Sequence, residues 1–111
     1  VGVVGGGWWC SYRSNFMTIS FEAKKELKNI APAIVHVDNT SRVQSVSKKY
    51  NLKFYKLINE FFKITKVPIL LNTSFNVKGE PIVCSPNDAI RTFYSTGLDQ
   101  LVLNNFLIKK K

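Results

Sequence analysis

The sequence predicts a domain of the α/β or α+β class, in which a mixed β-sheet is covered by two helices. Three observations support this prediction. Apolar residues recur at helical spacing between 51 and 65, and a helix-capping sequence begins at Ser85. Residues 67–71 form an unbroken apolar run, which is typical of a strand buried on both faces. The 111 residues are enough for one domain.

The first half of the chain contains three segments with strand character. Residues 22–28 are charged and are compatible with one helical turn, which Pro32 ends. The turn signal Asp38–Asn39 ends the second of the three segments. The expected strands are 16–21, 33–37 and 42–47.

Two helices are expected after these strands. Asn51 is a suitable N-cap for a helix that extends to Thr65, with one lysine-rich face and one apolar face. We interpret the apolar face as core and not as a ligand site; it consists of Phe54, Leu57, Ile58, Phe61 and Phe62. The second helix begins after Ser85 and ends at Gly97. Two short strands, 100–103 and 106–108, complete the chain.

The first residues differ in composition from the rest. Val1–Trp9 is rich in glycine, yet it contains neither the Gly-Lys-Ser/Thr of a P-loop nor a GxGxxG pattern. No basic stretch precedes an apolar core, so we do not predict a signal peptide. We divide the chain into an atypical flexible segment, 1–15, and a domain, 16–111.

The charge is strongly positive, with 16 Lys and Arg against 7 Asp and Glu, a net charge of +9. Such a field favours anionic partners. Because the lysines are scattered and only three arginines are present, we interpret them as a solvated surface and do not expect nucleic acid. The apolar runs are too short to span a membrane, so we expect no membrane partner. We also expect a cytoplasmic location.

The cysteine and histidine content argues against a metal site. Cys10 and Cys84 have no metal-ligand spacing, although one disulfide between them is possible, and His36 is the only histidine. Cys84 lies beside the start of a helix, where a thiol pKa can fall, but we expect it to be a buried, inert residue.

The loop 72–80 is the first candidate site, because it follows a predicted buried strand. Its amides, hydroxyls and glycine can approach phosphate oxygens, and Lys78 can add a charge. The competing interpretation is a polar turn whose side chains satisfy its own backbone. The second candidate is the turn 36–42, where Arg42 suits an oxyanion. There the competing interpretation is that His36 is a partly buried residue whose side-chain hydrogen bonds are satisfied by its neighbours, and that Arg42 pairs with Asp38. With no nucleophile nearby, a hydrolase is not supported.

Several motifs resemble those of the O-carbamoyltransferases of the nodulation and tobramycin type. Residues 32–46 resemble their PAVTHVDGTARVQTV-type stretch, and 67–83 resemble PVLLNTSFNVRGEPIV. Residues 85–103 are similar to SPEDALRTFLRTGLDALVL. The resemblance extends from about residue 16 to residue 110 and preserves the order of the motifs.

The resemblance implies the C-terminal, YrdC-like part of such an enzyme. In that family this part binds ATP and carbamoyl phosphate and forms carbamoyl adenylate, and magnesium is a possible companion of the ATP. A separate N-terminal domain that carries iron passes the carbamoyl group to a hydroxyl. The spacing of Ser74, Asn76 and Gly79 resembles the SxN…G signature of YrdC proteins at the nucleotide site. The implied binding residues are Arg42, Asn72, Thr73, Ser74, Asn76 and Gly79.

The chain departs from the family pattern at its beginning. A GPRALGNRS-type stretch and a KxRE-type stretch, which help to hold carbamoyl phosphate in the family, are absent. We therefore expect an incomplete domain fragment that is inactive alone, because the phosphate charge would be poorly offset. Two alternatives are kept: a basic RNA-binding YrdC-like module, and a structural remnant that forms a homodimer through an exposed sheet edge.

Overall fold

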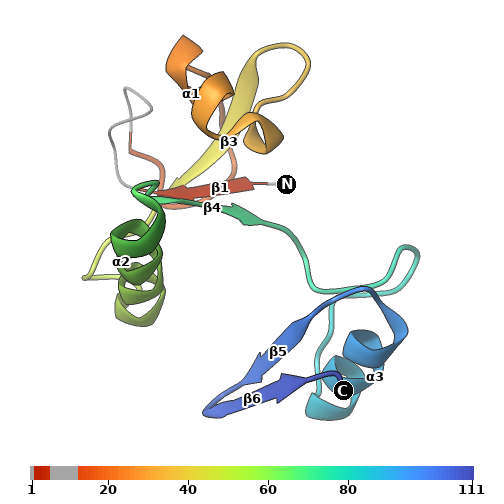
Figure 1. The fold of residues 1–111 in the computed structure, drawn as a ribbon. Helices are drawn as coiled ribbons and strands as arrows, with labels where there is room; N and C mark the ends of the chain where they lie inside the picture. The colour runs from red at the N-terminus through yellow and green to blue at the C-terminus, as the bar shows by residue number, and fades with distance from the viewer. Residues whose placement is uncertain (1, 6–12) are drawn as a thin grey trace. The chain divides into compact units, whose positions relative to one another are not determined.

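The computed structural model describes residues 2–5 and 13–111, which form two compact units (Figure 1). Unit 1 is Val1–Thr73 and unit 2 is Ser74–Lys111. Each unit combines strands with helices. The predicted mixed class of helix and sheet is therefore confirmed.

Unit 1 is built on a four-stranded sheet with the order β2-β3-β1-β4. Its strands are β1 (Gly2–Gly5), β2 (Ser20–Glu22), β3 (Thr40–Ser45) and β4 (Ile69–Asn72). β1 pairs parallel with β3 and antiparallel with β4, while β2 pairs antiparallel with β3. The sheet is thus mixed, as predicted, but its inner strand β1 was not expected from the sequence.

The segment 33–37, which we expected to be a strand, is not one. Pro32–Ile34 forms a 3-10 helix with the proline at its first position, and the Val35 amide donates to the Pro32 carbonyl across 3.1 Å. Proline suits this position because it lacks an N–H to donate and its φ is already helical. Helix α1 (Lys25–Ile30) precedes it, which confirms the expected helical turn.

The core of unit 1 is small. Among the described residues, its cluster of buried apolar side chains consists of Leu27 from α1, Ile34 from the 3-10 helix and Ile69 from β4. The prediction that residues 67–71 form a strand buried on both faces is wrong. Within the described part of the chain β4 lies at an edge of the sheet, and Leu71 is 52% exposed.

Helix α2 (Leu52–Thr65) confirms the predicted helix and its cap, because Asn51 Oδ1 accepts from the Phe54 amide at 3.1 Å. The predicted burial of its apolar face is wrong for most of that face. Ile58 is buried, but Leu57 and Phe62 are exposed. A helix buries only the side that packs against other elements, and within α2 only Ile58 is buried.

Unit 2 is a helix packed on a β-hairpin. Helix α3 (Pro86–Ser95) contributes Ala89 and Phe93 to a core that Leu101 of β5 (Gln100–Leu103) completes. β5 pairs antiparallel with β6 (Phe106–Lys109), which forms a separate two-stranded sheet. The two long helices were expected to cover one sheet. Instead, α2 belongs to unit 1 and α3 to unit 2.

The predicted flexible segment, 1–15, falls partly on residues 6–12, which lie outside the described residues, as does Cys10 with its proposed disulfide. The boundary at residue 15 stays a prediction. A search of the described residues finds no helix with the length and apolar character needed to cross a membrane.

Candidate functional site

Two of the predicted site residues lie in one row across the sheet of unit 1. Ser20 of β2 pairs with Arg42 of β3, and Gly2 of β1 pairs with Asn72 of β4. β1 and β3 pair in parallel, and extending their register by one residue toward the N-terminus places Gly2 beside Arg42. Directly paired residues point to the same face, so Arg42 and Asn72 share a face. Two strand spacings separate their Cα atoms by about 10 Å, and the glycine between them has no side chain.

Arg42 presents an exposed guanidinium on this face. Among the residues that the structure describes, it makes no ion pair, so the expected alternative of a pair with Asp38 is not found. The Asp38 carboxylate instead accepts from the amide and the hydroxyl of Thr40, at 3.0 Å and 2.7 Å. These hydrogen bonds, the hydroxyl first, lower the pKa of Asp38 below its usual 3.8. The guanidinium is therefore available to an anion.

Asn72 is half-buried, and its amide nitrogen lies 4.0 Å from the Met17 sulfur. On the same face the Gln44 side chain donates to the Asn15 carbonyl at 3.0 Å. These contacts place the segment 14–17 along this side of the sheet. The contact with sulfur is weak, so it leaves the Asn72 amide capable of binding a ligand oxygen.

His36 belongs to the same turn as Asp38, but its side chain is satisfied locally. Its Nδ1 lies 3.2 Å from Thr40 Oγ1, whose own proton is donated to Asp38. The geometry therefore assigns the Nδ1–H form to His36, with Nδ1 as the donor to Thr40. This local satisfaction of His36 agrees with the competing interpretation and gives no support to acid–base catalysis at this turn.

The loop of unit 2 contains the three predicted site residues of the SxN…G pattern, which are Ser74, Asn76 and Gly79. The Asn76 side-chain amide donates to the carbonyls of Val77 and Glu80, at 3.2 Å and 3.0 Å. Gly79 has φ = 88°, a conformation that favours glycine. Asn76 thus stabilises its own loop, as the competing interpretation expected, while Ser74 is exposed.

The six predicted residues are divided between the units. Arg42, Asn72 and the exposed Thr73 belong to unit 1, whereas Ser74, Asn76 and Gly79 belong to unit 2. Their roles in binding stay predictions.

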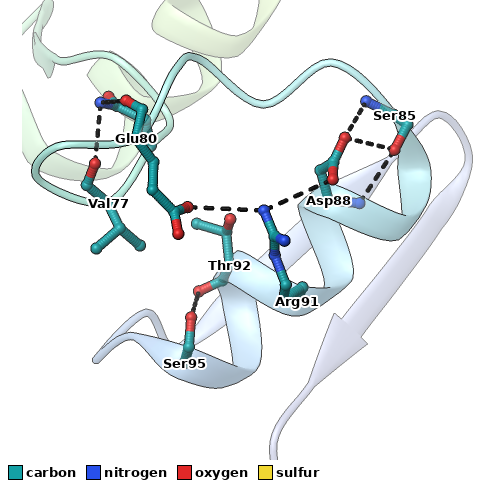
Figure 2. A network of polar contacts seen from close by, with 8 residues as sticks. Val77, Glu80, Ser85, Asp88, Arg91, Thr92 and Ser95 are labelled. Atoms are coloured by element: carbon teal, nitrogen blue, oxygen red, sulfur yellow. Dashed lines mark hydrogen bonds and ion pairs between the residues drawn. The ribbon is translucent and has the colours of Figure 1, made fainter.

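A polar network links the loop of unit 2 to α3 (Figure 2). The Ser85 amide donates to Asp88 Oδ2 at 3.1 Å and the Asp88 amide donates to Ser85 Oγ at 3.2 Å, which confirms the capping box. Ser85 Oγ also donates to Asp88 Oδ2 at 2.6 Å. Arg91 Nη2 lies 3.7 Å from the Asp88 carboxylate and 3.6 Å from that of Glu80. The hydrogen bonds from Ser85, the side-chain bond first, lower the pKa of Asp88.

The role of Arg91 was missed from the sequence. The spacing of Asp88 and Arg91 was the available signal, because residues three apart on a helix are neighbours. Nothing in the sequence indicated that Glu80 would join them from the loop.

The described residues contain no cluster of three or more His, Cys, Asp or Glu side chains that could hold a metal ion. Cys84 is an exposed free thiol, so the expectation of a buried cysteine is wrong.

Comparison with known proteins shows the family to which this chain is similar. The model of the carbamoyltransferase C-terminus matches residues 6–110. Nodulation protein NolO of Bradyrhizobium diazoefficiens is 49% identical over 96 residues, which cover 86% of this chain and 18% of NolO. NolNO of Sinorhizobium fredii is 48% identical over 96 residues, 86% of this chain and 14% of NolNO. An uncharacterized Synechocystis protein is 52% identical over 79 residues, 71% of this chain and 13% of that protein.

The chain therefore spans less than a fifth of the length of these relatives. The family match begins at residue 6, within the segment 1–15 of atypical composition. It nevertheless covers almost all of the described residues and includes both units. The chain belongs to the family of carbamoyltransferase C-terminal domains.

Proposed function

We propose that this chain is the part of an O-carbamoyltransferase that binds ATP and carbamoyl phosphate, from which the enzyme forms carbamoyl adenylate. The observation that supports this proposal most is the row formed by Arg42 and Asn72. An exposed guanidinium without an ion pair in the described residues shares a face with a side-chain amide. This combination suits a phosphoryl group, whose oxygens accept a charge-assisted bidentate bond from arginine and further bonds from neutral donors.

The roles follow from the chemistry of the groups. Arg42 offsets the phosphate charge of carbamoyl phosphate, and Asn72 donates to one of its oxygens. In unit 1, Thr73 adds a hydroxyl next to Asn72 in the sequence. In unit 2, Ser74 offers a hydroxyl to the phosphates of ATP, and Gly79 allows close approach of the backbone. Magnesium binds together with ATP. We assign iron to the N-terminal domain of the enzyme, where the carbamoyl group reaches a hydroxyl acceptor.

We further propose that the isolated chain binds these ligands weakly and does not turn them over. The basic GPRALGNRS-type and KxRE-type stretches are absent from its sequence. A single arginine in the row would position and neutralise the donor incompletely.

The experiment is a titration of the isotope-labelled chain with carbamoyl phosphate and with magnesium ATP, followed by NMR. Arg42→Gln should weaken carbamoyl phosphate binding about tenfold to a hundredfold, because a hydrogen bond to a charged group is worth about 1.5–3 kcal/mol. Arg13→Gln is the matched control, since Arg13 is also an exposed arginine of unit 1.

Equal effects of the two substitutions would contradict the assignment of Arg42. Shifts confined to the lysines of α2 would indicate a nonspecific anion surface. Salt-dependent binding of tRNA without any response to ATP would favour the RNA-binding alternative.

A further inference from the structure

Three apolar side chains of α2 form a stripe that stays partly or largely exposed among the described residues of unit 1. Leu57, Phe61 and Ile64 are 56%, 36% and 82% exposed. Spacings of four and three residues place them on one side of the helix. Ile58 is 7% exposed, so a different side of α2 already anchors it to unit 1. A contiguous apolar stripe on an anchored helix marks an interaction surface.

The charged residues near the stripe are mostly lysines. Glu60 is paired with Lys63 at 2.7 Å, which neutralises the one acidic residue of this helix. Lys53 and Lys56 are exposed and make no ion pair among the described residues. The surface therefore fits a partner with apolar side chains at its centre and carboxylates on its rim.

The relatives indicate where such a partner would come from. The aligned segment is 18% of NolO and 14% of NolNO, and the matching family model is a C-terminus. Most of a relative's chain therefore precedes the segment that corresponds to unit 1 and unit 2. We propose that the stripe of Leu57, Phe61 and Ile64 is the surface on which this preceding region of a carbamoyltransferase docks. The inference rests on the proposed role as one part of a larger transferase.

Two other occupants fit less well. A second copy of this chain would bring together two proteins of net charge +9, which repel each other. A membrane-surface helix lays its whole apolar side into the lipid, whereas the side of α2 that contains Ile58 is already buried.

The test measures binding in trans. The probe is NolO of Bradyrhizobium diazoefficiens from which the segment that matches this chain has been deleted, titrated with the full 111-residue chain. The double variant Leu57→Glu/Ile64→Glu should weaken binding at least a hundredfold, because each buried aliphatic side chain contributes about ten- to a hundredfold. Leu52→Glu is the matched control. Leu52 is also on α2 and is 49% exposed, but it lies off the stripe.

A second measurement keeps the inference testable if the shortened NolO does not fold. In full-length NolO, this chain replaces the matching segment, and thermal unfolding of the chimera is followed with and without the double substitution. The double variant should lower the melting temperature of the chimera clearly more than that of the isolated chain, and Leu52→Glu should lower both alike. Equal effects of the double variant in both contexts would overturn the inference.

The remaining outcomes are also decisive. Binding that Leu52→Glu weakens as much as the double variant would overturn the inference, as would a self-association or an attachment to anionic vesicles that the double variant abolishes. Carbamoyl phosphate titration of the same variants separates this inference from the proposed function. The variants should bind carbamoyl phosphate like the unsubstituted chain, so a chain that docks without binding carbamoyl phosphate would contradict only the proposed function.

Discussion

The side-chain amide of Asn76 donates to the backbone carbonyl of Glu80 across 3.0 Å, and this bond closes the loop that precedes α3. Glu80 in turn places its carboxylate 3.6 Å from Arg91 of that helix (Figure 2). An asparagine that the family resemblance suggested as a ligand contact therefore stabilises its own loop. Its substitution will affect stability.

Asn76→Ala should lower the free energy of unfolding by about 1–3 kcal/mol, because it removes two hydrogen bonds to loop carbonyls. Urea unfolding measures this change. Ser74→Ala is the control in the same loop and should change stability by less than about 0.5 kcal/mol, because Ser74 is exposed. Equal losses in the two variants would show that the hydrogen bonds of Asn76 do not hold the loop.

Stability should fall as the pH drops below about 4. Hydrogen bonds lower the pKa of Asp88 and of Asp38 in the folded protein, chiefly those from Ser85 and from Thr40. A carboxyl whose folded pKa is depressed stabilises the fold above its unfolded pKa, and this contribution is lost as the pH falls through the folded pKa. Urea unfolding between about pH 6 and about pH 3 should show the decline.

Ser85→Ala supplies the comparison for the pH profile. It removes the side-chain bond that contributes most to the lowered pKa of Asp88, and loss of an N-cap costs about 0.5–2 kcal/mol near neutral pH. The variant should therefore be less stable at neutral pH, and its stability should change less with pH over the range measured for the unsubstituted chain. A pH dependence equal to that of the unsubstituted chain would contradict the role assigned to the hydrogen bonds between Ser85 and Asp88.

Phe93→Ala should destabilise unit 2 by about 3–5 kcal/mol, because Phe93 is 0% exposed and its removal opens a cavity. Phe61→Ala should cost only about 1–2 kcal/mol, because Phe61 is 36% exposed and its burial contributes less. Amide hydrogen exchange can follow Leu101 for unit 2 and Ile69 for unit 1. A larger loss from Phe61→Ala than from Phe93→Ala would mean that α2 is buried in solution.

Lys66→Gly should raise stability by about 0.5–1 kcal/mol. Lys66 follows the last residue of α2 with φ = 61°, a left-handed conformation that costs energy for a residue with a Cβ. Thermal unfolding measures the gain. Lys63→Gly is the contrasting variant, because it places glycine within the helix and should be destabilising.

The parts of the fold that depend on local sequence were predicted well. Asn51 and Ser85 cap α2 and α3 as expected, because a cap requires only residues within one turn of it. The alternation at residues 42–47 also predicted a strand, which the structure places two residues earlier, at Thr40–Ser45. The 3-10 helix Pro32–Ile34 was missed, because the β-branched residues that follow Pro32 favoured a strand over residues 33–37.

Long-range relationships could not be predicted from the residues alone. Gly2–Gly5 is a strand because two distant strands flank it, not because glycine favours that conformation. The exposure of Leu57 depends on how much sheet lies under α2, which periodicity does not report. Arg42 and Asn72 were each selected as site residues, but their common row follows only from the strand register.

The position of β1 inside the sheet has a consequence for the folding pathway. The strand at the start of the sequence joins β3 to β4, so the Gly2–Asn72 pair closes a loop of about 70 residues. Contacts of such high sequence separation slow the search for the native state. During synthesis β3 and β4, which flank β1 in the sheet, are both made after β1 itself. Unit 1 should therefore fold more slowly than unit 2, where a short hairpin and one helix make local contacts.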